Sequence, residues 1–164
     1  DAILKELQLP LFVKPNNGGS SLGISKVKAA GELQQALDKA FNEDDQVLVE
    51  EFISGREFTI GVFKSKGKII ALPITEVTPA NVEESIAEKV RAEARRAYSV
   101  FNCNGIVRID FIYNETDGNP YMLEINTVPG QSAASLVPQQ VVAMGWTLKE
   151  FYTALIEECF NNQK

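Results

Sequence analysis

In Gly105-Ile-Val-Arg-Ile-Asp-Phe-Ile-Tyr113, and again in Tyr121-Met-Leu-Glu-Ile125, β-branched and aromatic residues follow one another as they do in strands. Between these runs, Asn114-Glu-Thr-Asp-Gly-Asn-Pro120 is a cluster of turn-forming residues. This stretch therefore predicts an antiparallel β-hairpin, around which the rest of the chain can be arranged.

Polar side chains alternate with apolar ones along both predicted strands. Because successive side chains point to opposite faces of a strand, Arg108 and Asp110 share one face, and Glu124 and Asn126 share one face of the partner. Two carboxylates and an amide form an all-oxygen set of the kind that Mg²⁺ prefers. The alternative is a solvated surface hairpin with charge pairs across its strands. Apolar neighbours favour a cleft, since carboxylates are costly to bury without a cation.

Three further strands are predicted upstream of this hairpin. Residues 46–52 and 57–63 are β-branched and aromatic runs, separated by Ser54-Gly-Arg56, and residues 68–72 follow after another turn. We expect these strands to form a three-stranded antiparallel meander.

Two helices are indicated by apolar stripes and capping residues. The longer one covers residues 82–101, with Asn81 as its N-cap. The last one begins after Thr147, which forms a capping box with Glu150. Cys159 lies on the apolar stripe of this last helix, so we expect it in the core.

The amino-terminal segment predicts a strand, a glycine loop, a second strand and a helix. The strand at 9–15 carries Lys14 near its end, and the polar loop at 16–23 follows directly. Backbone amides and an ammonium group hold phosphates in this way, although an ordinary hairpin turn is the alternative. The second strand covers 24–27, and an amphipathic helix begins at about Gly31.

A loop of small residues, Ser132-Ala-Ala-Ser-Leu136, follows Thr127-Val-Pro-Gly130. Its amides and hydroxyls are able to hold a carboxylate. The residues alone favour an ordinary loop before a helix near Gln139.

Composition excludes several classes of function. The 164 residues are 45% apolar, enough for a single packed domain. Their net charge of −6 disfavours binding to nucleic acids or to anionic membrane surfaces. The sequence contains no histidine, so Ser/His/Asp catalysis and histidine-ligated zinc are excluded. Two cysteines without a CxxC spacing fit a reducing cytoplasm.

Taken together, four motifs resemble those of the ATP-grasp ligases, and most closely the D-alanine-D-alanine ligase family, over nearly the whole chain. The motifs are Phe12-Val-Lys-Pro-Asn-Asn-Gly-Gly-Ser-Ser-Leu-Gly-Ile-Ser-Lys-Val27, Glu50-Glu-Phe-Ile-Ser-Gly-Arg-Glu57, Arg108-Ile-Asp-Phe111 and Glu124-Ile-Asn-Thr-Val-Pro-Gly130, completed by Ser135-Leu-Val-Pro138. The resemblance implies an α+β ATP-grasp fold with antiparallel sheets packed against helices. It places residues 1–72 in part of the ATP-binding subdomain and 78–164 in the carboxy-terminal subdomain, with the amino-terminal domain absent.

The resemblance also implies roles for individual residues. Lys14 would contact the phosphates of ATP, beneath a loop containing Ser20 and Ser21, and Arg108 would stabilise the transferring phosphoryl group. The implied nucleotide-binding residues are Lys14, Ser21, Glu50, Glu51, Phe52, Ile53 and Glu57, of which Glu51 and Ile53 read adenine through their backbone and Glu57 accepts the ribose hydroxyls. The implied catalytic residues are Arg108, Ser20 and Gly130. The implied ligands of two Mg²⁺ ions, or of Mn²⁺, are Asp110, Glu124 and Asn126, and the D-alanine-binding residues are Gly130, Ser135 and Leu136.

The implied activity is the ATP-dependent ligation of two D-alanines through an acyl phosphate, for peptidoglycan precursors, by a cytoplasmic homodimer. Alternatives are a D-alanine-D-lactate or D-alanine-D-serine ligase, another ATP-grasp carboxylate-amine ligase, or a noncatalytic nucleotide-binding fragment. The family carries a lid loop where this chain passes from Val77 to Thr78. We therefore expect that these two residues are not neighbours in the natural protein, and that this chain alone is inactive.

Overall fold

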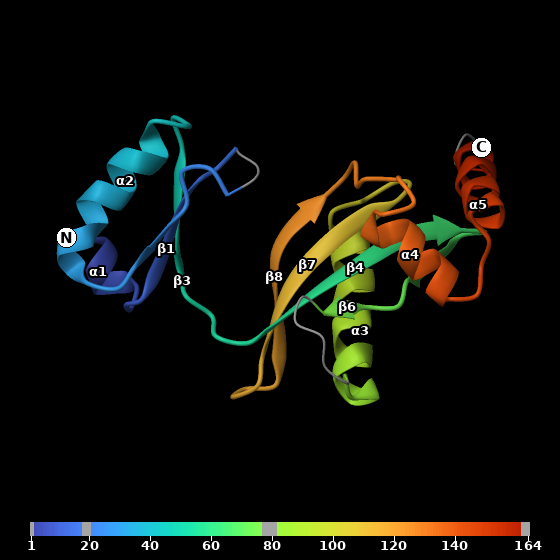
Figure 1. Ribbon diagram of the computed structural model, residues 1–164, viewed down its shortest axis with the longest axis horizontal. Helices are drawn as coiled ribbons and strands as arrows, with labels where there is room; N and C mark the ends of the chain where they lie inside the picture. The colour runs from blue at the N-terminus through green and yellow to red at the C-terminus, as the bar shows by residue number, and fades with distance from the viewer. Residues whose placement is uncertain (1, 18–20, 77–81, 162–164) are drawn as a thin grey trace. The chain divides into compact units, whose positions relative to one another are not determined.

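A computed structural model of the chain describes residues 2–17, 21–76 and 82–161 (Figure 1). The chain divides into two compact units, Asp1–Ile53 and Ser54–Lys164. Each unit has its own sheet, helices and core, so the expectation of a single packed domain is wrong. Within the described ranges, no helix combines the length and apolar character needed to cross a membrane.

The first unit is a three-stranded antiparallel sheet packed against a helix. Its strands, in the order β2-β1-β3, are β1 (Leu11–Pro15), β2 (Ser25–Val27) and β3 (Val47–Glu51). Its helical elements are α1 (Ile3–Glu6), the 3-10 turn η1 (Ala30–Glu32) and α2 (Leu33–Phe41). The core is made by alternate strand residues and the apolar stripe of α2: Leu11, Val13, Val27, Leu33, Ala36 and Ala40. The predicted succession of strand, loop, strand and helix is confirmed.

The second unit is built on a five-stranded antiparallel sheet. Its strands are β4 (Arg56–Ser65), β5 (Lys68–Ala71), β6 (Thr75–Glu76), β7 (Val107–Asn114) and β8 (Asn119–Asn126). Their order is β5-β4-β7-β8, and β6 pairs with the same strand β4 as β5 does. Strands β7 and β8 form the hairpin predicted from the sequence.

Helices cover both faces of this larger sheet. They are α3 (Glu84–Val100), α4 (Leu136–Ala143) and α5 (Leu148–Asn161). Ile60 on β4 and Ile109 on β7 belong to the core beneath α3. Phe63 on β4 packs instead with Val137 of α4 and Phe151 of α5. Because strand residues alternate between faces, Arg108 and its neighbours of the same parity lie on the face of α4.

The predicted meander is only partly correct. Strands β4 and β5 do form a hairpin, but β3 pairs with β1 in the other sheet. Gly55 is not a turn residue joining β3 to β4: a Cβ atom there would collide with the carbonyl oxygen of Tyr113, so this glycine allows the chain to pass close to β7. The units divide at 53/54, whereas the functional division expected between 72 and 78 stays a prediction.

The predicted capping box at α5 is confirmed. The amide of Thr147 donates to Glu150 Oε2 at 2.8 Å, and the amide of Glu150 donates to Thr147 Oγ1 at 3.2 Å. The long helix α3 begins at Glu84, while its expected cap, Asn81, lies outside the described residues. The Val77–Thr78 junction lies outside them as well.

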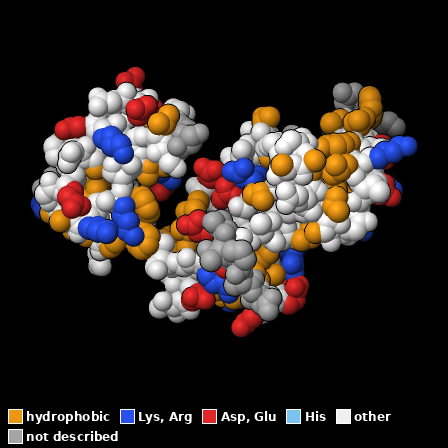
Figure 2. Space-filling view, in the orientation of Figure 1, with side chains coloured by type: hydrophobic (Ala, Val, Ile, Leu, Met, Phe, Trp, Pro, Cys, Tyr) orange, Lys and Arg blue, Asp and Glu red, His pale blue; other side chains and the backbone are white. Residues whose placement is uncertain are grey.

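The prediction that Cys159 is a core residue is wrong, because its side chain is exposed. Ile156 and Phe160 are exposed on the same helix, and Figure 2 shows hydrophobic side chains at the surface near the carboxyl end of the chain. Glu158 is buried instead: it contacts Lys64 at 3.6 Å and accepts the amide of Gly67 at 3.2 Å. The end of α5 therefore packs on the turn between β4 and β5 through a carboxylate.

Candidate functional site

An arginine between two carboxylates is the centre of the candidate site. Arg108 Nη2 donates to Asp110 Oδ2 at 2.9 Å and to Glu124 Oε1 at 3.4 Å. Across the hairpin, Arg108 pairs with Asn126 and Asp110 pairs with Glu124. The structure thus brings together all four residues that strand alternation predicted to converge.

A β-bulge in β8 adjusts this arrangement. Asp110 pairs with Glu124 but the next residue, Phe111, pairs with Met122, which leaves Leu123 as the extra residue. Met122 therefore lies with Phe111 beside α3, and Glu124 keeps its place opposite Asp110. The sequence pattern alone did not predict this bulge.

Two polar atoms at this centre have no hydrogen-bond partner among the described residues. They are Arg108 Nε and Asp110 Oδ1, and both are buried. An unpaired buried polar atom is costly, so such atoms indicate a place where a ligand, an ion or an ordered water completes the hydrogen bonding. Asn126 Oδ1 accepts the amide of Val128 at 3.0 Å and keeps a second lone pair.

The donor atoms around Asp110 are suited to a hard cation. Asp110 and Glu124 supply carboxylate oxygens, and Asn126 supplies an amide oxygen. Within the described ranges there is no cluster of three or more His, Cys, Asp or Glu side chains able to hold a metal. A cation held by two carboxylates and one amide would therefore draw its remaining ligands from water or substrate, which is usual for Mg²⁺.

A pocket of about 230 Å³ adjoins Arg108. Gly130, Ser135 and Leu136, the three residues expected to bind the substrate, all line it. A Cβ atom on Gly130 would lie 2.8 Å from Ser135 Oγ, so this position favours glycine. Ser135 Oγ is also 2.9 Å from Ser132 Oγ.

The first turn of α4 forms part of the pocket wall. Ser135 is the N-cap residue with extended backbone angles, and its side chain makes no capping hydrogen bond. The first amides of a helix lack partners within the helix and carry partial positive charge. The amides of Leu136 and Val137 and the guanidinium of Arg108 therefore give the pocket hydrogen-bond donors for a carboxylate, although Asp110 and Glu124 offset the charge of Arg108.

On the first unit, the candidate nucleotide-binding side chains lie on the sheet face opposite α2. Lys14 Nζ contacts Glu50 Oε2 at 2.8 Å, and Phe12 pairs with Glu50 across the strands. The rings of Phe12 and Phe52 are 5.8 Å apart. This face therefore combines an ion pair with an aromatic surface.

The segment expected to form the adenine hinge continues from the end of β3. The amide of Phe52 donates to the carbonyl of Pro10 at 3.0 Å. Because adjacent residues of a strand direct their backbone groups to opposite sides, those of Glu51, the last residue of β3, point away from β1, while Ile53 lies beyond the end of this strand. In the described sheet, β3 has no strand on that side.

Three expected nucleotide-binding or catalytic residues remain: Glu57, Ser21 and Ser20. Glu57 is exposed on β4, where it pairs with Ile112 in the second unit. Ser21 has a positive φ of 60°, and Ser20 lies outside the described residues.

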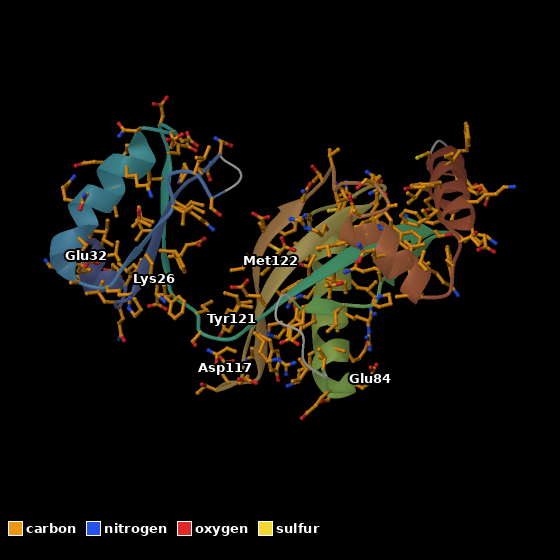
Figure 3. All side chains as sticks on the ribbon, viewed as in Figure 1. Lys26, Glu32, Glu84, Asp117, Tyr121 and Met122 are labelled. Carbon is orange, nitrogen blue, oxygen red and sulfur yellow. The ribbon has the colours of Figure 1, made fainter. Side chains whose placement is uncertain are left out.

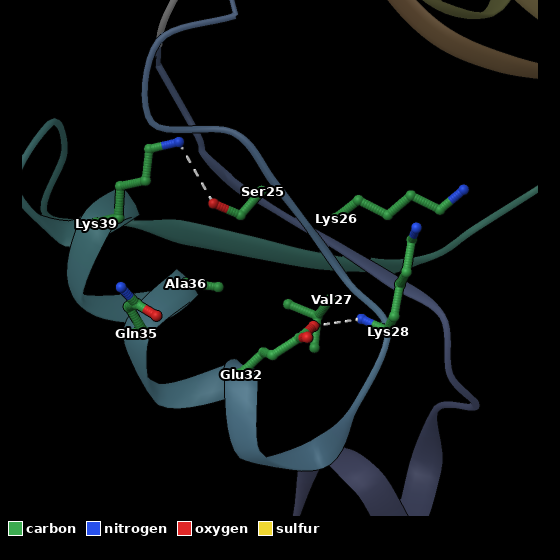
Figure 4. A pocket seen from close by; sticks show the side chains of 8 residues that line it. All are labelled: Ser25, Lys26, Val27, Lys28, Glu32, Gln35, Ala36 and Lys39. Atoms are coloured by element: carbon green, nitrogen blue, oxygen red, sulfur yellow. Dashed lines mark hydrogen bonds between the residues drawn. The ribbon is translucent and has the colours of Figure 1, made fainter.

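A surface hollow of about 540 Å³ between β2 and α2 contains none of the expected site residues (Figure 4). Lys39 Nζ donates to the carbonyl of Ile24 at 2.8 Å, and the amide of Lys28 donates to Glu32 Oε2 at 2.8 Å. The hydrogen bond from Lys28 is the main cause of a lowered pKa at Glu32. These contacts join the residues on either side of β2 to α2 and to η1.

Two residues at the candidate sites, Lys26 and Gln140, were not predicted from the sequence. Lys26 lies with its Nζ 3.2 Å from the ring centroid of Phe52, on the first unit (Figure 3). Its pairing with Phe12 places it on the same face as Lys14, which strand alternation would have indicated once the register was known. Gln140, a buried amide on α4, had no signal in the sequence.

The chain matches the family model described as D-ala D-ala ligase C-terminus over residues 1–81 and 73–157. It is 39% identical to a D-alanine–D-alanine ligase of Parabacteroides distasonis, covering 100% of this chain and 56% of that protein. It is 42% identical to one of Flavobacterium johnsoniae, covering 94% and 54%. The chain thus spans about half the length of the curated relatives it matches.

Solved structures that resemble this chain are also D-alanine ligases. The VanG D-Ala:D-Ser ligase of Enterococcus faecalis matches with a TM-score of 0.88 and 28% identity, over 95% of this chain and 51% of that one. A D-alanine–D-alanine ligase of Bacillus anthracis complexed with ATP matches with a TM-score of 0.77 and 31% identity, over 94% and 52%. These neighbours are ATP-grasp enzymes of mixed α+β fold, which agrees with the fold class expected from the sequence.

Proposed function

This chain belongs to the D-ala D-ala ligase C-terminus family, and we propose from that premise that it is part of a cytoplasmic enzyme that joins two D-alanines with ATP for peptidoglycan precursors. The observation that carries the proposal is the cluster of Arg108, Asp110 and Glu124. Two of its buried atoms have no hydrogen-bond partner in the described part of the chain, and Arg108 lines a pocket of about 230 Å³. Such a site has the donors to bind a phosphoryl group, a cation and a carboxylate.

The first unit supplies the nucleotide contacts in this proposal. Lys14 binds the phosphates together with the loop that contains Ser20 and Ser21. The backbone groups of Glu51 and Ile53 hydrogen-bond to adenine, and Phe52 packs against its ring. Glu50 releases Lys14 when the phosphates bind. Glu57 is assigned the ribose hydroxyls.

Asp110, Glu124 and Asn126 hold the divalent cations, two Mg²⁺ or Mn²⁺. The unpartnered Asp110 Oδ1 and the all-oxygen donor set fit this assignment. When bound, the cations neutralise charge on the phosphoryl oxygens. Arg108 directs its guanidinium to the same group and stabilises the charge that develops there.

The pocket beside Arg108 binds D-alanine. Gly130 leaves room next to Ser135, and the amides at the start of α4 receive the carboxylate. A carboxylate oxygen of the first D-alanine attacks the γ-phosphorus, which gives an acyl phosphate and ADP. The amine of the second D-alanine then attacks the acyl carbon, inorganic phosphate leaves, and the amine loses a proton. Neither step requires a histidine, because positioning and charge stabilisation carry both.

The acceptor of the acyl group is the least constrained part of the proposal. Neighbouring solved structures include one named as a D-Ala:D-Ser ligase and others named as D-alanine–D-alanine ligases. A D-lactate or D-serine acceptor is therefore the second candidate. The homodimer and the absence of nucleic-acid and membrane partners remain predictions.

The test uses the natural full-length protein that contains this chain. We expect D-alanine-dependent release of phosphate from ATP, with D-alanyl-D-alanine detected by mass spectrometry. Competition with D-lactate and D-serine identifies the acceptor from the mass of the product. Binding of ATP without any D-alanine-dependent turnover would favour the noncatalytic fragment. The isolated chain should bind nucleotide but show no sustained turnover.

The Val77–Thr78 junction is tested by the gene. The alignment with the Parabacteroides distasonis relative runs over 184 residues, about 20 more than this chain contains. The two segments of the family match also meet at 73–81. Both observations support an intervening segment in the natural protein. A gene that encodes Val77 and Thr78 as consecutive residues would contradict it.

A further inference from the structure

Gln140 makes three hydrogen bonds from α4 to two strands of the larger sheet. Its side chain is 3% exposed. Its Oε1 accepts the amide of Gly61 at 2.8 Å, and its Nε2 donates to the carbonyl of Thr59 at 2.9 Å and to Thr75 Oγ1 at 3.0 Å. Both amide hydrogens are thus used, and the group is bound from three sides.

These bonds close an interruption in the sheet. Strands β5 and β6 both pair with β4, but β5 ends at Ala71 and β6 begins at Thr75. A continuous strand would bond the backbone of Thr59 and Gly61 along this edge. The amide of Leu72 donates to the carbonyl of Gly61 at 2.9 Å, and the side-chain amide of Gln140 bonds the remaining two groups, the amide of Gly61 and the carbonyl of Thr59. Helix α4 is thus fastened to β4 by the equivalent of two ladder hydrogen bonds.

The point of attachment lies directly beside the candidate site. Gly61 pairs with Arg108 across β4 and β7, and Thr59 pairs with Asp110. A Cβ atom on Gly61 would lie 3.1 Å from Gln140 Oε1 and 3.3 Å from Val137 Cγ2, so α4 rests closely on the strand here. Gly61, to which Gln140 anchors α4, is therefore the cross-strand neighbour of Arg108.

The same helix carries the wall of the pocket. Leu136 precedes Gln140 by four residues, so the two side chains lie on one helical face, one turn apart. Leu136 and Val137 line the pocket next to Arg108. A shift of α4 along β4 would move this wall relative to the guanidinium and to Asp110.

We propose that Gln140 is a positioning residue, which sets the place of the substrate pocket on α4 relative to Arg108 and Asp110. The inference rests on the proposed function, because it concerns the same site. Reacting groups misplaced by about 1 Å lose about 100-fold in rate. An amide bound from three sides fixes the helix both along and across the strand, which apolar packing alone does less strictly.

The experiment compares three variants of the natural full-length protein. Gln140→Met keeps the length of the side chain and removes all three hydrogen bonds. Thr75→Val removes one of them. Tyr98→Phe is the matched control, because it removes a buried hydrogen bond, from the Tyr98 hydroxyl to the Gly105 carbonyl at 2.8 Å, on the α3 face of the same unit.

For Gln140→Met we expect kcat to fall by about 10- to 100-fold and KM for D-alanine to rise, while KM for ATP changes by less than about twofold. Thr75→Val should show the same pattern more weakly. Tyr98→Phe should lower the midpoint of thermal unfolding and leave kcat unchanged.

If Gln140→Met fails to fold, kcat and KM of Thr75→Val test the proposal instead. Retention of kcat and KM by the folded variants, or equal loss in Tyr98→Phe, would overturn the positioning role while leaving the proposed function intact. Absence of D-alanine-dependent turnover in the unmodified protein would overturn both.

Discussion

Two arginines of the larger sheet, Arg56 and Arg108, contact carboxylates, and their contacts are built differently. Arg56 meets Glu76 in a fork, with Nε to Oε1 at 2.7 Å and Nη2 to Oε2 at 2.9 Å. Arg108 meets Asp110 through one bond of 2.9 Å, while its own Nε and Asp110 Oδ1 have no partner among residues 2–17, 21–76 and 82–161. The first pair is complete, whereas the second keeps its capacity for a ligand.

The faces of the sheet explain this difference. Arg56 alternates in phase with Phe58, over whose ring its guanidinium lies, on the face that α3 covers. Arg108 lies on the opposite face, beside the pocket that α4 borders. A complete ion pair serves stability, while an incomplete one beside a pocket serves binding. A substitution at Asp110 should therefore mainly lower activity, whereas a substitution at Glu76 should mainly lower stability.

The largest effect is expected from Asp110→Asn in the full-length protein. Turnover should fall by on the order of 100-fold or more, because charge neutralisation by a bound cation contributes several kcal/mol to such reactions. The Mg²⁺ concentration for half-maximal activity should rise. The free energy of unfolding should change by less than about 1 kcal/mol, since Asp110 is only half-paired. Activity measured across a Mg²⁺ titration checks this, and an unchanged Mg²⁺ requirement would refute the metal assignment.

A smaller effect, of the opposite kind, is expected from Glu76→Gln. The free energy of unfolding should fall by about 1.5–3 kcal/mol, because two charge-assisted hydrogen bonds are weakened. The Mg²⁺ requirement should stay as in the unmodified protein. Urea unfolding together with the same Mg²⁺ titration checks this. A variant that keeps its stability but loses its Mg²⁺ response would mean that the two pairs had been assigned the wrong roles.

The smallest effect concerns pH. The hydrogen bonds from Arg56 lower the pKa of Glu76 below its usual 4.5. A carboxyl group with a lowered pKa stabilises the folded state above its unfolded pKa, and this contribution is lost as pH falls through the folded-state pKa. The difference in unfolding free energy between the unmodified protein and Glu76→Gln should therefore be constant above about pH 5 and shrink below pH 4.5. If the two unfolding free energies still differ by the same amount at lower pH, the stability lost in Glu76→Gln does not come from the charge of Glu76.

Local patterns predicted much of the fold. The capping box at Thr147 and the hairpin around 114–120 were readable because each depends on residues close in sequence. The convergence of Arg108, Asp110, Glu124 and Asn126 followed from strand alternation plus one hairpin. These features need no knowledge of distant partners.

Long-range features were not readable in the same way. The composition of β3 identifies a strand but not its partner, so pairing with β1 in place of β4 required the whole fold. Cys159 lies on an apolar stripe, but the carboxyl end of α5 has exposed apolar residues and packs through Glu158. The role of Gln140 depends on contacts with residues 65 and more positions away in the chain.

The contact between Lys14 and Glu50 has a consequence for how an anion would arrive on the first unit. The lysine already carries its own counterion, so a phosphate that binds Lys14 exchanges one oxyanion for another. The net gain is the difference between two ion pairs, which makes it smaller and less dependent on ionic strength than the formation of a new pair. The ammonium is also held in place before the exchange, so the side chain gives up little rotational freedom when the phosphate takes over.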